Sequence, residues 1–88
     1  APRIRSPLRG LTYLVAASGN TWAPLHLSAD ADGDVARLYW FADKTYLGQT
    51  VSGQSLDWRP GRPGVYRLRV VDDHGRADLR TVRVALRP

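Results

Sequence analysis

The chain has 88 residues, too few for two separate hydrophobic cores, so we expect one domain that spans residues 1–88. It contains no cysteine, which excludes disulfide staples and thiolate zinc sites and leaves the hydrophobic core to hold the fold. Twelve Arg and one Lys stand against eight Asp, for a net charge of +5 that favours anionic partners. A GC-rich genome would also favour Arg over Lys, and this explains the use of Arg in place of Lys better than it explains the excess of cations.

No apolar run approaches the roughly 20 residues that a bilayer-spanning helix needs. The sequence starts at Ala1 without a Met or an apolar signal region, which is typical of a piece cut from a larger protein. We therefore expect the domain to be a module of a longer chain.

Apolar and polar residues alternate with a period of two, between short turns rich in Gly, Pro, Asp and Asn. No window shows an apolar stripe at helical spacing, so the pattern predicts strands and no helix. In chain order, the predicted strands cover residues 4–7, 12–16, 24–29, 36–42, 45–49, 55–58, 66–70 and 77–86. Turns are predicted at residues 9–10 and 18–20 and in the Pro-Gly segment 60–64.

The alternation also assigns the faces of these strands. In the fourth strand, Leu38 and Trp40 share the inward face, and Trp40 is predicted to anchor the core. In the two last strands the residues predicted to face inward are Tyr66, Leu68, Val70, Val82, Val84 and Leu86. Gly75 supplies the positive φ that the hairpin between them requires. Short strands with turns every 8 to 12 residues predict an all-β fold, an immunoglobulin-like antiparallel β-sandwich of about seven strands.

The chain offers little material for catalysis. It has two His, one Lys, no Glu and no Cys, and neither His stands in a recognised catalytic pattern. His26 is predicted at an outward strand position and His74 in a hairpin turn, where solvated or locally bonded side chains are typical. We therefore predict no catalytic residue and no cofactor.

The acidic loop with Asp30, Asp32 and Asp34 resembles a calcium site only superficially. An EF-hand loop that started at Asp30 would need Gly at its sixth position and Glu at its twelfth, where Val35 and Phe41 stand. We expect a solvated turn there and no bound metal. Asp72 and Asp73 are likewise interpreted as turn residues whose side chains cap nearby backbone groups.

The order of several short motifs resembles the C-terminal domain of class A bifunctional penicillin-binding proteins of the C type. The resemblance covers most of the chain, and Lys44 departs from it, because a Gly is expected in that turn. The motifs are Ile4, Ser6-Pro7, Gly10, Leu25-x-Leu27-x-Ala29, Trp40-Phe41, Leu47-Gly48, Trp58-x-Pro60, Pro63-Gly64, Val70-Val71-Asp72, Gly75-Arg76 and Val82-Arg83-Val84.

This resemblance implies a context. The parent would be a periplasmic peptidoglycan synthase with glycosyltransferase and transpeptidase domains, tethered to the inner membrane by its own anchor, and this module would be its tail. The transpeptidase motifs are absent from the module itself. A Ser-x-x-Lys nucleophile is impossible, because Lys44 is the only lysine and Phe41 stands three residues before it. We therefore expect this domain not to be an enzyme.

In immunoglobulin-like sandwiches the strand that carries the core Trp and the strand of residues 66–70 belong to one sheet, so their outward residues share a surface with those of the last strand. That surface is predicted to show Arg37, Tyr39, Phe41, Arg67, Arg69 and Arg83. Arg beside exposed aromatic rings is typical of contact with a protein or an anionic glycan. A plainer interpretation is that the Arg stems only cover apolar sheet surface.

Three hypotheses of function follow. The first is a non-catalytic interaction module that docks a periplasmic protein, or the parent's own transpeptidase domain, through this Arg and aromatic surface. The alternative is direct binding of peptidoglycan or another anionic wall polymer. The third, nucleic-acid binding, is prompted by charge alone, and because no recognised motif supports it we expect no nucleic-acid partner.

Overall fold

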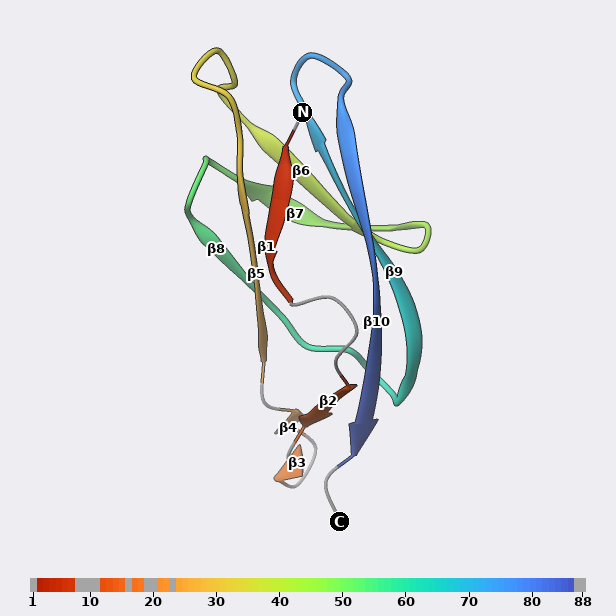
Figure 1. The fold of residues 1–88 in the computed structure, drawn as a ribbon. Coiled ribbons are helices and arrows are strands. Elements are labelled where there is room, and N and C mark those ends of the chain that lie inside the picture. The colour runs from red at the N-terminus through yellow and green to blue at the C-terminus, as the bar shows by residue number, and fades with distance from the viewer. Residues whose placement is uncertain (1, 8–11, 16, 19–20, 23, 87–88) are drawn as a thin grey trace.

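The computed structural model of the chain describes residues 2–7, 12–15, 17–18, 21–22 and 24–86, and in these residues it contains strands and turns only (Figure 1). The strands are β1 Arg3–Ser6, β2 Thr12–Val15, β3 Ala17–Ser18, β4 Thr21–Trp22, β5 Leu25–Asp30, β6 Leu38–Ala42, β7 Thr45–Thr50, β8 Ser55–Trp58, β9 Gly64–Asp72 and β10 Ala77–Leu86. The predicted all-β class is confirmed, and most predicted strands agree within two residues.

Two sheets form the body of the sandwich. One has the order β1-β5-β8, and the other has the order β2-β10-β9-β6-β7; a short pair, β3-β4, lies at one end (Figure 1). The pairing of β6 with β9 sets Trp40 opposite Val70, so the predicted shared sheet is confirmed. One pairing differs from the antiparallel prediction, because β2 runs parallel to the last residues of β10. The predicted turn at residues 9–10 and residues 19–20 of the predicted turn 18–20 lie outside the described residues, whereas Ser18 belongs to β3.

The core fills the space between the two sheets. Trp40 is fully buried, as predicted, and its indole Nε1 donates a 3.0 Å hydrogen bond to Thr50 Oγ1. Thr50 is itself buried, so this bond satisfies two polar groups that water does not reach. The buried apolar residues are Ile4, Leu27, Ala29, Leu38, Trp40, Ala42, Trp58, Leu68, Val70, Val82 and Val84. The inward positions predicted by alternation are thus confirmed, except that Tyr66 is only half-buried and Leu86 has no described side chain.

Two charged residues of β10 also occupy positions of inward parity. Asp78 and Arg80 are half-buried and precede Val82 on the same face. Asp78 Oδ2 accepts a 2.9 Å hydrogen bond from Ile4 N, and Arg80 Nη1 donates a 2.7 Å bond to Pro7 O. Among the residues described, β2 pairs only with residues 83–86 of β10, so residues 77–82 have no backbone partner on that side. There β10 contacts β1 and Pro7 through the side chains of Asp78 and Arg80 instead of through a ladder of backbone hydrogen bonds. Alternation alone did not identify this tie between the sheets.

Gly48 is placed where the two sheets approach each other closely. Its φ is +149°, and a Cβ built there would lie 3.3 Å from Leu56 Cδ1 of the opposite sheet. Gly48→Ala is therefore expected to lower the free energy of unfolding by about 1–2 kcal/mol, through backbone strain and crowding. Gly33→Ala is the matched control, since no atom lies within 4 Å of its added Cβ. Equal urea midpoints for the two variants would contradict this account.

Candidate functional site

The outward surface of the larger sheet gathers the cations and rings that the sequence singled out. We call it the outer face and define it by Tyr39, Phe41, Tyr46, Val65, Arg67, Arg69, Leu79, Thr81 and Arg83. Strand register sets these neighbours, because Arg69 lies opposite Phe41 on one side and opposite Leu79 on the other. Arg67 lies opposite Thr81, and Arg83 follows two residues later on the same side of β10.

An aromatic and cationic stack occupies the centre of this face. The guanidinium carbon of Arg69 lies 4.7 Å from the centroid of the Phe41 ring, a cation–π contact. The ring of Tyr46 lies 5.5 Å from that of Phe41, centroid to centroid, at an interplanar angle of 59°. Phe41 is half-buried beneath Arg69, whereas Tyr46 is 53% exposed. The stack holds the guanidinium group of Arg69 in a defined orientation at the surface.

The turn between β6 and β7 lies against β9 beside this stack. Asp43 has a φ of +52°, a left-handed conformation that Asp tolerates better than most residues. Its N–H donates to Arg67 O at 2.8 Å, and its Oδ1 accepts from Arg67 N at 3.1 Å. These two bonds continue the β6–β9 ladder by one step and place Lys44 next to Arg67 and Arg69. Lys44 is the position where the family pattern expects Gly, and the positive φ falls on Asp43 instead.

Two hollows flank Arg69. The first has a volume of about 420 Å³ and is lined by Asp43, Lys44, Arg67, Arg69 and Leu79. The second has a volume of about 450 Å³ and is lined by Tyr39, Phe41, Arg69, Val71, Gly75 and Ala77. One hollow is therefore cationic with an apolar edge, and the other is largely apolar.

The cations of the outer face are not neutralised within the described part of the chain. There the guanidinium groups of Arg67, Arg69 and Arg83 and the ammonium group of Lys44 form no hydrogen bond or ion pair with another side chain. Within the described residues Asp43 lies among these cations, and the other carboxylates are engaged elsewhere: Asp30 with Arg5, Asp57 with His26, Asp73 with Ala36 N, Asp78 with Ile4 N, and Asp32, Asp34 and Asp72 with Arg76. The described residues of the outer face and the adjoining turn therefore carry four cations, Lys44, Arg67, Arg69 and Arg83, and one acid, Asp43, which leaves this face with a net positive charge.

The predicted surface residues are arranged largely as expected. Arg67, Arg69 and Arg83 are exposed on the outer face, and Tyr39 and Phe41 lie among them, half-buried where full exposure was expected. Arg37 is exposed one residue before β6 begins, so no strand register places it on this face. Their role in binding stays a prediction.

Three apolar members of the face escaped the sequence analysis: Tyr46, Val65 and Leu79, all more than half exposed. Alternation along β10 places Leu79 on the same side as Thr81, so a signal for it existed. The position of Tyr46 depends on an irregularity in the β6–β7 register after Trp40, and the alternation of apolar and polar residues did not predict this irregularity.

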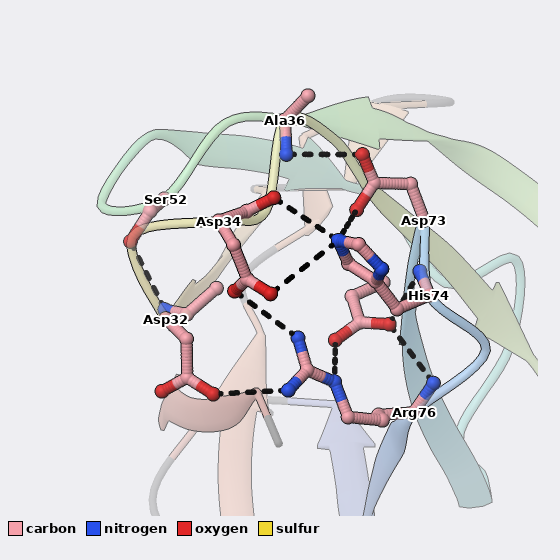
Figure 2. Close-up of polar contacts among 9 residues, drawn as sticks. Asp32, Asp34, Ala36, Ser52, Asp73, His74 and Arg76 are labelled. Atoms are coloured by element: carbon pink, nitrogen blue, oxygen red, sulfur yellow. Dashed lines mark hydrogen bonds and ion pairs between the residues drawn. The ribbon is translucent and has the colours of Figure 1, made fainter.

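A second polar cluster joins two loops at one end of the sandwich (Figure 2). Arg76 donates from Nε to Asp72 Oδ2 at 2.8 Å and contacts Asp32 and Asp34 at 3.2 and 3.4 Å. Asp72 is buried, and its Oδ1 accepts from the backbone N–H groups of His74 and Arg76 at 2.9 Å each. The predicted capping role of Asp72 is confirmed. Asp32 and Asp34 lie in an exposed turn, as predicted, and each also contacts Arg76, which is 44 and 42 residues away in sequence, respectively.

Electrostatics within this cluster shift three pKa values. Burial alone would raise the pKa of Asp72, but hydrogen bonds from the backbone and side chain of Arg76 and from His74 N together lower it. The pKa of Arg76 is raised, chiefly by its bond to Asp72. The pKa of His74 is raised by its bond to Asp34 O, at 3.0 Å, and by the Asp34 and Asp73 carboxylates; partial burial and Arg76 oppose the change. The cluster thus ties the β5–β6 loop to the β9–β10 hairpin.

This tie is expected to weaken as the pH rises. Because the folded-state pKa of His74 is raised above 6.5, protonated His74 stabilises the fold below that pH, and its contribution is lost as the pH rises through the folded value. Melting temperatures measured from about pH 6 to about pH 9 should fall in the wild type and fall less in His74→Gln. Parallel curves for the two proteins would contradict the assignment.

The other histidine lies far from this end. His26 Nδ1 lies 2.6 Å from Asp57 Oδ1, and both side chains are exposed on the outward side of the smaller sheet, as predicted for His26. The described residues contain no grouping of three or more His, Cys, Asp or Glu side chains suited to a metal ion. In the same part of the chain, no helix has the length and apolar character to cross a membrane.

Comparison with known proteins agrees with this architecture. A solved structure described as "Structures of Clostridium thermocellum CbhA fibronectin(III)-like modules" is similar, with a TM-score of 0.71 and 18% sequence identity, over 96% of this chain and 94% of that one. This likeness supports the predicted immunoglobulin-like sandwich and concerns the fold alone. A search of curated protein sequences found no match.

Sequence comparison at the level of families is more specific. The profile of the Penicillin-Binding Protein C-terminus Family matches residues 1–84, nearly the whole chain. The order of motifs from Ile4 to Val84 had predicted this membership. The chain belongs to the Penicillin-Binding Protein C-terminus Family and is an accessory C-terminal domain of that kind.

Proposed function

We propose that this domain is a non-catalytic docking module of a periplasmic bifunctional penicillin-binding protein, and that its outer face binds a protein surface of opposite charge. The partner is either another periplasmic protein or the catalytic part of its own polypeptide, which the parent's anchor holds at the inner membrane. The observation that carries the proposal is the centre of the outer face, where Arg69 lies 4.7 Å over Phe41 with unneutralised cations beside it.

Three features support a protein as the partner. Exposed Tyr46, Val65 and Leu79 lie on the same face as the Arg residues, and aromatic residues and Arg are enriched in protein interfaces. Arg69 is already oriented by Phe41, so less side-chain entropy is lost when it binds. The hollows beside it can accept protruding side chains. A purely anionic wall polymer would use the cations but would leave the apolar residues without a role.

Photocrosslinking in the full-length parent tests this proposal. Thr81 lies exposed on the outer face opposite Arg67, and Ser55 is its control, exposed on β8 of the other sheet. With p-benzoylphenylalanine at position 81 we expect an adduct with a protein or within the parent chain, and none with the same group at position 55. Adducts at position 55 alone would overturn the proposal. Co-sedimentation of the purified domain with sacculi, abolished by Arg69→Glu, would favour the wall-polymer alternative instead.

A further inference from the structure

The cationic hollow beside Arg69 has the features of a specific subsite. Lys44, Arg67 and Arg69 line it, and they face a single acid, Asp43. One oxygen of that acid, Oδ1, already accepts the backbone N–H of Arg67, so Asp43 is held against β9 and offsets only part of the positive charge. An anion that enters this hollow would therefore meet three cations and one anchored carboxylate.

The shape of the hollow results from the left-handed turn. Asp43 adopts a φ of +52° and is bound at both its N–H and its carboxylate to the backbone of Arg67. Strained conformations of this kind persist where surrounding contacts impose them, and they are frequent at binding sites. The consequence here is that Lys44, the residue after Asp43, lines the hollow together with Arg67 and Arg69 of β9.

One residue that lines the hollow is apolar. Leu79 lines the same hollow, is 59% exposed, and lies directly across the strand pair from Arg69. An exposed Leu next to a group of cations fits a ligand that carries an acidic and an aliphatic group close together. Side chains two positions apart in an extended peptide share one side and lie about 7 Å apart, so one such pair can reach both Leu79 and the cations.

We propose that this hollow, lined by Lys44, Arg67, Arg69 and Leu79, binds an extended acidic peptide segment of the docked protein. A Glu or Asp side chain of the segment pairs with the cations, and an aliphatic residue two positions away packs on Leu79. The inference rests on the proposed docking function and assigns the chemistry of the partner: carboxylate and aliphatic side chains of a protein.

A titration followed by amide chemical shifts tests the subsite in the 88-residue chain. The probe is the blocked peptide acetyl-Leu-Ser-Glu-Ser-Leu-amide, and its neutral control has Gln in place of Glu. We expect saturable shifts centred on Lys44, Arg67, Arg69 and Leu79, and binding about fivefold weaker for the Gln peptide. Lys44→Ala and Leu79→Ala should each weaken binding of the Glu peptide about fivefold.

Arg62→Ala is the matched control for charge, because Arg62 is an exposed cation in the β8–β9 turn, away from the hollow. It should leave the affinity unchanged, and the spectra report folding of every variant. Equal binding of the Gln peptide, shifts centred on the smaller sheet, or equally tight binding of inorganic phosphate would each overturn the subsite. If the Glu peptide does not bind while position 81 still crosslinks, the outer face docks its partner without using the hollow, and the subsite is wrong. If the Glu peptide binds in the hollow but position 81 gives no adduct, the proposed docking function is wrong and the subsite binds acidic peptides independently of it.

Discussion

Replacing Trp40 with Ala is expected to lower the free energy of unfolding by about 4 kcal/mol, the largest effect of any single change considered for this domain. Trp40 is fully buried between the sheets and also bonds Thr50, which is buried. The substitution leaves a large cavity and an unsatisfied hydroxyl at the same place. A domain of this size has a total stability of only about 4–13 kcal/mol, so much of it would be lost.

Equilibrium denaturation in urea measures this effect. Tyr46→Ala is the matched control, since it also removes an aromatic ring, but one that is 53% exposed. We expect its midpoint to lie close to that of the wild type, with a loss of about 1 kcal/mol or less. Similar midpoints for Trp40→Ala and Tyr46→Ala would show that the fold does not depend on the Trp40 anchor.

The architecture was largely predictable because its strands alternate strictly. Along β9, Leu68 and Val70 face the core and Arg67 and Arg69 face outward, as the sequence alone indicated. The same pattern in β6 identified Trp40 as the anchor. Each one-residue step in a strand reverses the face, so a short alternating segment determines which side is buried. Membership of the family followed from motif order, not from any one of these positions.

Features that depend on contacts between distant segments were not predictable. Arg76 binds Asp32 and Asp34 only because the β5–β6 loop and the β9–β10 hairpin meet at one end of the sandwich (Figure 2). The parallel pairing of β2 with β10 and the inward use of Asp78 likewise require the assembled sheets. The periodicity of apolar residues within one strand contains no information about contacts between segments that are distant in sequence.

The candidate site was predictable in part. Alternation correctly placed Arg67, Arg69 and Arg83 on one surface, and it extends to Leu79. The stack of Arg69 on Phe41 could not be predicted without knowing that β6 pairs with β9. The hollow at Lys44 could not be predicted without knowing that the turn at Asp43 is left-handed. The residue types were thus predictable, whereas the shape of the binding surface was not.

Reversing two charges at the centre of the outer face is expected to weaken docking at least 100-fold, by about 2.7 kcal/mol or more. Arg67→Glu combined with Arg69→Glu removes the attraction to an acidic partner and adds repulsion. It also removes the cation–π contact with Phe41. Within the described residues neither guanidinium forms an ion pair, so the domain should remain folded.

The most direct test of docking through the outer face is the dissociation constant of this double variant for the partner crosslinked at position 81. Arg3→Glu combined with Arg62→Glu changes the net charge equally at two exposed positions outside the outer face. We predict a loss of at least 100-fold in affinity for the outer-face variant and a change of less than about fivefold for the control. Equal losses of affinity in the two variants would show that binding depends on the net charge of the domain and not on the outer face. An unchanged affinity of the outer-face variant would contradict docking through this face.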